Sequence, residues 1–265
     1  MSDIEKKCRN IRHSIMEMIA NAGGGHAGAS LSLVELAACL YETGRFYKNS
    51  RPRDRFLLSK GHAGIGLYAV LAEYGILPKE TLKTFASDEG PLMNHPDAHR
   101  IPGVEVSTGS LGHGLSLAVG MCLAAKLKGE EHSVFCLVGD SECHEGSVWE
   151  AAMLAGDRQL TNLCVIVDRN NLGNDGAIQV HLDPLNDKWR SFGWKTIELN
   201  GHDCQEISKA YKKIYKEKDG PYAIIANTQK GRGLIEGLSG QGPCHYIKGS
   251  KEDIIKCFLP EIREG

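Results

Sequence analysis

Two polar side chains in the middle of the chain are spaced so that they could hold a metal ion and a phosphate together. Asp140 follows an apolar run at residues 134–138, and Asn170 follows a second apolar run at residues 163–167. Between the runs, small and apolar residues recur at helical spacing: Val148, Ala151, Ala152 and Ala155. A strand–helix–strand unit of this kind predicts parallel strands joined by a right-handed crossover. Both polar residues then lie at the carboxyl ends of the strands, where open parallel sheets bind ligands.

The oxygen donors of this pair favour a hard cation. A carboxylate and an amide oxygen suit Mg²⁺, which prefers octahedral oxygen coordination and shares it with phosphate groups and water. The backbone carbonyl of Leu172 could supply a third protein oxygen. Taken alone, Asp140 and Asn170 fit equally well as a helix cap and a turn residue. The two residues therefore leave both interpretations open.

The wider pattern around this pair resembles the thiamine-diphosphate signature of the transketolase family. The pattern consists of Gly139, Asp140, Ser141, Glu145, Gly146, Asn170 and Asn171. The spacing from Asp140 to Asn170 also matches, and the resemblance extends over roughly residues 5–250. Ser141 departs from the family, which normally has Gly there, but its backbone N–H can still face a phosphate. Gly173 is a second departure, at a position where relatives often carry Gln.

The resemblance implies a fold, a cofactor and a set of binding residues. It predicts an α/β fold with a parallel sheet flanked by helices, binding thiamine diphosphate with Mg²⁺, or with Ca²⁺ or Mn²⁺ in its place. Asp140, Asn170 and the Leu172 carbonyl would bind the metal. Other cofactor positions would be Gly109, Ser110 and Leu111 beside the aminopyrimidine ring, and Gly139, Ser141 and Glu145. Glu145 matches a glutamate that lies at the subunit interface in the family.

Four histidines match the active-site histidines of the family. Imidazoles suit proton handling near neutral pH. By resemblance, His26 and His95 would meet oxygen atoms of the substrate, and His62 and His245 would lie between the diphosphate and the substrate. The short motifs around the first three support these assignments, whereas the surroundings of His245 depart from the family. His113 and His144 are left open, and no motif surrounds His13, His99, His132 or His202.

Composition limits the class of protein. The chain has 265 residues, a formal net charge of −2 and nine scattered cysteines. It has no apolar stretch approaching about 18 residues and no signal-peptide pattern at its start. We therefore expect one domain over residues 1–265, with no nucleic-acid or membrane surface. Scattered single cysteines predict reduced thiols in a cytoplasmic protein.

Periodicity predicts the other elements. An amphipathic helix is expected from Ile4 to about Gly23, and Ser32 with Glu35 forms a capping box for a helix running to about Tyr41. Three more strands are expected at residues 53–59, 194–199 and 222–228. Further helices are expected after Lys60, Pro78 and Gly114 and at residues 205–216, with an irregular loop at residues 90–106.

The resemblance also predicts a two-chain enzyme. In the family, a second region grips the pyrimidine ring and supplies the glutamate that activates it, and no such region is found within these 265 residues. The expectation is the N-terminal subunit of a split transketolase, inactive alone. With a companion C-terminal subunit it would form a heterotetramer of two copies of each chain. That assembly would transfer a ketol unit between sugars or sugar phosphates.

Three alternatives compete with this hypothesis. The nearest is another split thiamine-diphosphate enzyme, such as a deoxyxylulose-phosphate-synthase-like or 2-oxo-acid dehydrogenase component; the motifs around His26, His62 and His95 favour transketolase. A non-catalytic regulatory subunit is disfavoured because the metal pair and the histidines are intact. A nicotinamide-dependent dehydrogenase is disfavoured because the only glycine fingerprint, at residues 23–28, follows a helix rather than a strand.

Overall fold

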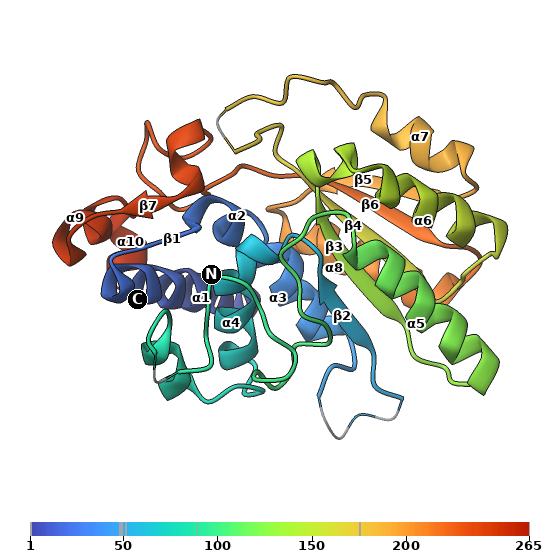
Figure 1. The fold of residues 1–265 in the computed structure, drawn as a ribbon, viewed down its shortest axis with the longest axis horizontal. Helices are drawn as coiled ribbons and strands as arrows, with labels where there is room; N and C mark the ends of the chain where they lie inside the picture. Colours follow the sequence, from blue (N-terminus) through green and yellow to red (C-terminus); the bar gives the residue numbers. More distant parts are fainter. Residues whose placement is uncertain (1, 48–49, 51, 89, 175, 265) are drawn as a thin grey trace.

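A five-stranded parallel sheet forms the centre of the molecule. The computed structural model describes residues 2–47, 50, 52–88, 90–174 and 176–264. The strands lie in the order β2–β3–β4–β6–β5, and every neighbouring pair is parallel (Figure 1). Their bounds are β2 (Arg55–Leu58), β3 (Val134–Gly139), β4 (Leu163–Arg169), β5 (Lys195–Asn200) and β6 (Tyr222–Asn227). The predicted fold class is confirmed.

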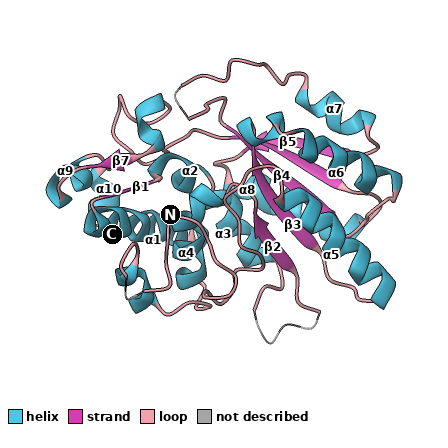
Figure 2. Cartoon of the chain, viewed as in Figure 1, coloured by secondary structure: helices cyan, strands magenta, loops and turns pink. Residues whose placement is uncertain are grey.

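Helices cover both faces of this sheet (Figures 1 and 2). One face carries α5 (Gly114–Lys128), α6 (Gly146–Asp157) and α7 (Leu185–Ser191). The other face is covered by α3 (Val34–Thr43) and α8 (Cys204–Glu217), and α1 (Asp3–Ala22) and α4 (Gly64–Glu73) pack beside α3. Alternate side chains of β3 divide between the two cores, with Phe135 and Leu137 in one and Cys136 and Val138 in the other. Because both faces are buried, the strand reads as a continuous apolar run.

The central crossover has the predicted arrangement. β3 and β4 are adjacent, and their register places Gly139 opposite Asp168. Both strands therefore end at the same edge of the sheet, and Asp140 and Asn170 lie in the neighbouring loops that follow them. The 3₁₀ helix η3 (Ser141–His144) separates β3 from α6.

The N-terminal region confirms one helix and corrects another prediction. α1 ends at Gly23, which has a left-handed backbone (φ 72°). The predicted capping box at Ser32 and Glu35 is wrong, because α3 starts after Leu33 without a side-chain cap. Ser32 instead ends the short helix α2 (Ala27–Ser32) and donates its hydroxyl to Asp168. A buried carboxylate replaces the local backbone N–H as its partner.

The helices expected after Lys60 and Pro78 are present: the 3₁₀ helix η1 (Gly61–Ala63) leads into α4, and η2 (Lys79–Thr84) is also a 3₁₀ helix. Several other short elements have no clear signal in the sequence. They are the strands β1 (Gly24–Gly25) and β7 (Ile247–Lys248), the helices α9 (Lys251–Lys256) and α10 (Pro260–Arg263), and the 3₁₀ helix η4 (Gly242–His245). β1 pairs antiparallel with β7, which brings the segment after η4 beside the end of α1. No helix in the described part of the chain is long and apolar enough to span a membrane.

Candidate functional site

Asp140 ties together the two loops that follow β3 and β4. Its side chain is 3% exposed, and its carboxylate accepts backbone N–H bonds from Ser141 (2.8 Å), Asn170 (2.9 Å) and Asn171 (2.6 Å). Burial and the nearby charge of Asp168 raise the pKa of Asp140 to about 6, although the three N–H bonds act in the opposite direction. A negative charge at this position therefore calls for a cation.

The three predicted metal ligands lie in one hydrogen-bonded pair of loops. The amide oxygen of Asn170 accepts from the backbone N–H of Leu172 at 3.1 Å. The Leu172 carbonyl accepts from the hydroxyl of Ser141 at 3.2 Å, which links it to the Asp140 loop. A carboxylate, an amide oxygen and a carbonyl make an all-oxygen donor set that fits Mg²⁺. Among the described residues, no group of three or more His, Cys, Asp or Glu side chains is arranged to hold a metal.

Neither departure from the family pattern strains the backbone. Ser141 is the first residue of η3, so its backbone is helical and needs no glycine. A Cβ added at Gly173 would meet the Gly176 carbonyl at 3.6 Å and the Ser141 hydroxyl at 3.9 Å, which are ordinary contacts. The loop therefore accommodates Ser141 and would accommodate a larger residue at position 173.

A buried ion pair lies next to this loop pair, and sequence reasoning missed it. Asp168 is 0% exposed and Lys60 is 2% exposed, and the ammonium group of Lys60 donates to the Asp168 carboxylate. Ser32 and Thr228 also donate hydroxyl groups to Asp168. Burial alone would raise the pKa of Asp168, but the Lys60 charge and these hydrogen bonds outweigh it and keep the pKa below its usual range. The pair joins β2, β4, α2 and the end of β6.

Glu142 holds the glycine-rich turn before α5. Its buried carboxylate accepts from the backbone N–H of Gly112 at 2.9 Å, from that of Gly139 at 3.1 Å and from the Ser59 hydroxyl. Burial raises the pKa of Glu142 despite these donors. Glu145, which the sequence singled out, is exposed and occupies the N-cap position of α6 without a capping hydrogen bond from its side chain. No periodicity or motif in the sequence separates the roles of these two glutamates.

The predicted pyrimidine-contacting turn, residues Gly109, Ser110 and Leu111, packs closely against the loop that carries His62. A Cβ at Gly61 would lie 2.6 Å from the Gly109 nitrogen and 2.7 Å from the Thr108 carbonyl oxygen, so only glycine fits there. A Cβ at Gly109 would in turn come within 3.1 Å of the His95 ring. These close approaches place the turn between the two histidine-bearing segments.

The four predicted histidines come together from four separate parts of the chain. The ring centroid of His26 lies 5.7 Å from that of His62, 6.3 Å from that of His95 and 5.2 Å from that of His245. The rings of His62 and His245 are 5.6 Å apart. The assignment of His245, whose surroundings depart from the family, therefore has geometric support.

Burial keeps two of these rings uncharged at neutral pH. It lowers the pKa of His62 to about 2, with further contributions from Lys60 and His245. It also lowers the pKa of His26, together with the charges of His95 and Lys230. The Nδ1 atom of His26 is buried and has no hydrogen-bond partner within the described residues. That nitrogen is a buried polar atom left unsatisfied at the centre of the cluster.

Two further residues border this cluster. Lys230 is 4% exposed and donates to the Gly173 carbonyl at 2.6 Å; burial lowers its pKa. The Tyr246 ring stands edge-on to that of His26, with centroids 4.9 Å apart. The sequence could have predicted Lys230 near the site, because it follows the predicted strand at 222–228 and so lies at the same sheet edge as Asp140. Nothing in the sequence indicated Tyr246.

The histidines that the sequence left open or set aside have other partners. His144 is exposed and its ring nitrogens contact the carbonyl oxygens of Ser141 and Val180. His113 is exposed at the start of α5. His202 contacts Glu35 at 3.0 Å.

Comparison with known sequences identifies the family. The family model described as transketolase, thiamine diphosphate binding domain, matches residues 4–245. An apulose-4-phosphate transketolase subunit from Actinobacillus succinogenes is 39% identical, with 99% of this chain and 96% of that protein covered. The 6-deoxy-6-sulfo-D-fructose transketolase subunit SqwG of a Clostridium species is 40% identical, with 99% and 98% covered. Mouse transketolase is 39% identical over 98% of this chain but only 42% of its own length.

Solved structures agree with the sequence relatives. A transketolase variant from Pichia stipitis in complex with fructose 6-phosphate superposes with a TM-score of 0.90 at 30% identity, covering 100% of this chain and 40% of that one. The transketolase of Campylobacter jejuni gives a TM-score of 0.86 at 30% identity, covering 96% of this chain and 42% of that one. This chain thus spans about two fifths of the full-length enzymes and nearly all of the subunit relatives. The chain belongs to the transketolase family and contains that family's thiamine-diphosphate-binding domain.

Proposed function

We propose that this chain is the N-terminal subunit of a two-component transketolase. It would act with a companion subunit to transfer a two-carbon ketol unit from a ketose donor to an aldose acceptor. The observation that carries this proposal is the meeting of His26, His62, His95 and His245 beside the loops of Asp140 and Asn170. The subunit relatives, which match over nearly their whole length, support a split enzyme.

In this proposal the loop oxygens hold Mg²⁺, which binds the diphosphate. Asp140, Asn170 and the Leu172 carbonyl would be its protein ligands, with Gly139, Ser141 and Lys230 nearby. Ca²⁺ or Mn²⁺ would suit the same hard oxygen donors. Bound thiamine diphosphate would supply the electron sink that carbon–carbon bond cleavage requires.

The histidines would orient the substrate and carry its protons. His62 and His245 would contact both cofactor and substrate. His26 and His95 would contact substrate oxygens and exchange protons with them. Tyr246, against the His26 ring, would help to exclude water from this side.

The companion subunit would supply the pyrimidine-binding domain and the glutamate that activates the cofactor. The surface formed by α5 and α6 would be buried in an assembly with two copies of each chain. Its exposed apolar side chains support this: Leu117 (44% exposed), Leu127 (88%), Met153 (48%) and Leu154 (42%). Glu145 is exposed at the start of α6, consistent with an interface role. We further propose a single domain over residues 1–265 and a cytoplasmic location. The nine free thiols support the latter.

The test is reconstitution of ketol transfer from purified chains. This chain is assayed alone and with its companion, with thiamine diphosphate and Mg²⁺, using a panel of ketose donors. The panel includes apulose 4-phosphate and 6-deoxy-6-sulfo-D-fructose, the sugars for which the two subunit relatives are named. We expect transfer only when both chains are present, and loss of transfer when a chelator removes the metal. Full activity from this chain alone would overturn the two-component proposal, and failure of the complex to bind thiamine diphosphate would overturn the function.

A further inference from the structure

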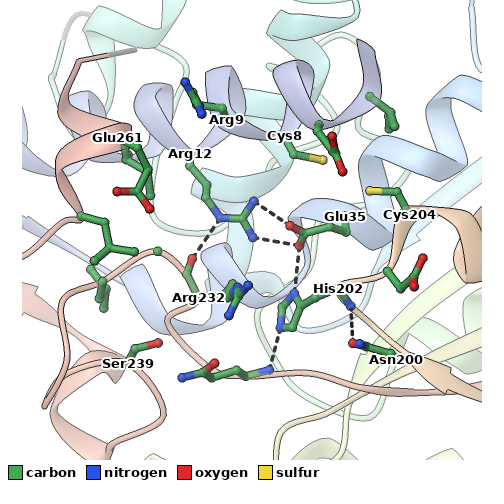
Figure 3. Close-up of a pocket in the computed structure, with 18 of the residues that line it drawn as sticks. Cys8, Arg9, Arg12, Glu35, Asn200, His202, Cys204, Arg232, Ser239 and Glu261 are labelled. Carbon is green, nitrogen blue, oxygen red and sulfur yellow. Dashed lines mark hydrogen bonds and ion pairs between the residues drawn. The ribbon is translucent and has the colours of Figure 1, made fainter. Parts of the chain in front are cut away.

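A second cleft, separate from the residues of the histidine cluster, lies between α1, the start of α8 and the segment after β6 (Figure 3). Its volume is about 1520 Å³. Its floor is a charged network: Arg12 pairs with Glu35 at 2.8 Å, and His202 contacts the same carboxylate at 3.0 Å. The proposed ketol transfer assigns no role to this cleft.

Three thiols gather at one side of the cleft. Cys8 of α1 and Cys204 of α8 both line it, and Figure 3 shows their sulfur atoms directed toward each other. Cys39 of α3 lies behind them, 0% exposed, with its Sγ 3.7 Å from the Cys204 carbonyl oxygen. All three are free, and Cys8 and Cys39 lie close enough to Cys204 to shift the pKa of its thiol. Helices α1, α3 and α8 thus bring three thiols together beside the cleft.

Cys204 is the most reactive of the three on physical grounds. It is the first residue of α8, a 14-residue helix whose N-terminus is capped by Asp203 and favours a negative charge. The neighbouring thiols of Cys39 and Cys8 lower the pKa of Cys204, against burial and the charges of Glu35 and Glu5. The pKa values of Cys8 and Cys39 are raised, so these two remain thiols. Cys204 is also partly exposed.

We propose that Cys204 and Cys8 are a peroxide-oxidisable pair that closes a disulfide between α1 and α8. The Cys204 thiolate attacks one oxygen of hydrogen peroxide, the O–O bond breaks, and hydroxide leaves, giving a sulfenic acid. The Cys8 sulfur then attacks the Cys204 sulfur, the S–O bond breaks, and water leaves with the proton of the Cys8 thiol. Two thiols and one peroxide become one disulfide and two waters. Cys8 is the resolving partner because it faces the cleft, whereas Cys39 is enclosed.

The disulfide would lie beside the network that holds the start of the segment after β6. Cys8 is one helical turn before Arg12, whose Nε donates to the Arg232 carbonyl at 3.0 Å. His202, two residues before Cys204, accepts the backbone N–H of Gln229 at 2.8 Å. The cross-link would therefore fix the two elements that anchor the chain on either side of Lys230.

The test is peroxide treatment of the purified, fully reduced chain, followed by alkylation of remaining thiols and peptide mass mapping. We expect a Cys8–Cys204 peptide, with the protein mass lower by about 2 Da and restored by dithiothreitol. Cys204→Ser should abolish this product, and Cys8→Ser should leave a sulfenic acid on Cys204 that dimedone labels. Cys257→Ser is the matched control, because Cys257 is also partly exposed but burial raises its pKa. It should behave like the unchanged chain.

A measurement on the unchanged chain keeps the test independent of variant folding. The rate of alkylation by a small haloacetamide at pH 6 should be about tenfold or more higher at Cys204 than at Cys257. Equal rates at these two residues, or a peroxide-induced disulfide mapped to any pair other than Cys8–Cys204, would overturn the proposal. None of these readouts depends on ketol transfer or on the companion subunit.

Discussion

Replacing Lys60 by Met is expected to lower the free energy of unfolding by about 3–4 kcal/mol, because it leaves the Asp168 carboxylate without its cation. Met has nearly the length of the Lys stem, so the packing of the 2%-exposed side chain is largely kept. What is lost is the ion pair with a carboxylate that is 0% exposed. Ser32 and Thr228 still donate to Asp168 but carry no charge.

The structure sets an upper bound on this loss. Without Lys60, the buried carboxylate can escape its penalty by taking up a proton. Protonating at pH 7 a carboxyl group whose ordinary pKa is 3.8 costs about 4 kcal/mol, at about 1.4 kcal/mol per pH unit. The loss of unfolding free energy should therefore fall in the range stated for Lys60→Met. It should be smaller at lower pH, where protonating the Asp168 carboxylate costs less free energy.

The assay is urea unfolding, followed by circular dichroism, of the unchanged chain, Lys60→Met, Asp168→Asn and the double variant. Asn keeps the shape of the carboxylate without its charge, so the double variant should recover about 2 kcal/mol or more relative to Lys60→Met. A loss below about 1 kcal/mol for Lys60→Met would refute the reasoning, since burying an unpaired carboxylate costs more free energy than that. A double variant as unstable as the sum of the two single changes would refute it as well.

Three further predictions concern the histidines and the metal loop. The pKa of His62 is about 2 in the folded chain and about 6.5 in the unfolded chain, so between these values only the unfolded state binds the proton, and stability is lost as pH falls below 6.5. Urea unfolding at pH 7.5 and at pH 5.5 measures this loss, and His62→Asn should make it smaller by about 1.4 kcal/mol. In the assembled enzyme, Asp140→Ala should weaken thiamine-diphosphate binding about 10- to 150-fold, measured by calorimetric titration with Mg²⁺ present. The control Asp157→Ala, at the exposed end of α6, should leave this affinity unchanged. Unaltered affinity in Asp140→Ala would contradict the metal assignment. His26→Ala and His95→Ala should each lower kcat by about 10²- to 10⁴-fold with the cofactor Kd nearly constant, and a mainly cofactor-binding defect would show that their roles are misassigned.

Local patterns in the sequence predict the fold where one face or one run decides the structure. The runs at 134–138 and 163–167 are continuous because both faces of the sheet are covered, and they form β3 and β4. The capping box at Ser32 and Glu35 fails for the opposite reason. Glu35 pairs with Arg12, and Ser32 donates to a carboxylate far along the chain, so tertiary partners override the local pattern.

The site was predictable where a residue carries a short motif, and not where its role rests on a distant contact. His26, His62 and His95 stand in recognisable surroundings, and the structure gathers them with His245. Tyr246 has no such motif, because its place beside the His26 ring depends on the pairing of β1 with β7. β1 and β7 have two residues each, which is too short for an alternating apolar pattern to be recognised in the sequence. Glu142 and the pair of Lys60 with Asp168 depend in the same way on contacts between segments far apart in the sequence.

The two buried aspartates at the ends of β3 and β4 support placing a cation at one of them and not at the other. Asp168 has its own counter-ion in Lys60, and its pKa is held below the usual range. Asp140 has only backbone N–H donors, and burial with the charge of Asp168 raises its pKa to about 6. Lys230 acts on Asp140 through its charge, but its ammonium group donates to the carbonyl of Gly173, and no ion pair joins it to Asp140 in the described part of the chain. A divalent cation between Asp140, Asn170 and the diphosphate of the cofactor would supply the missing positive charge, which gives a physical reason for this carboxylate to be buried where it is.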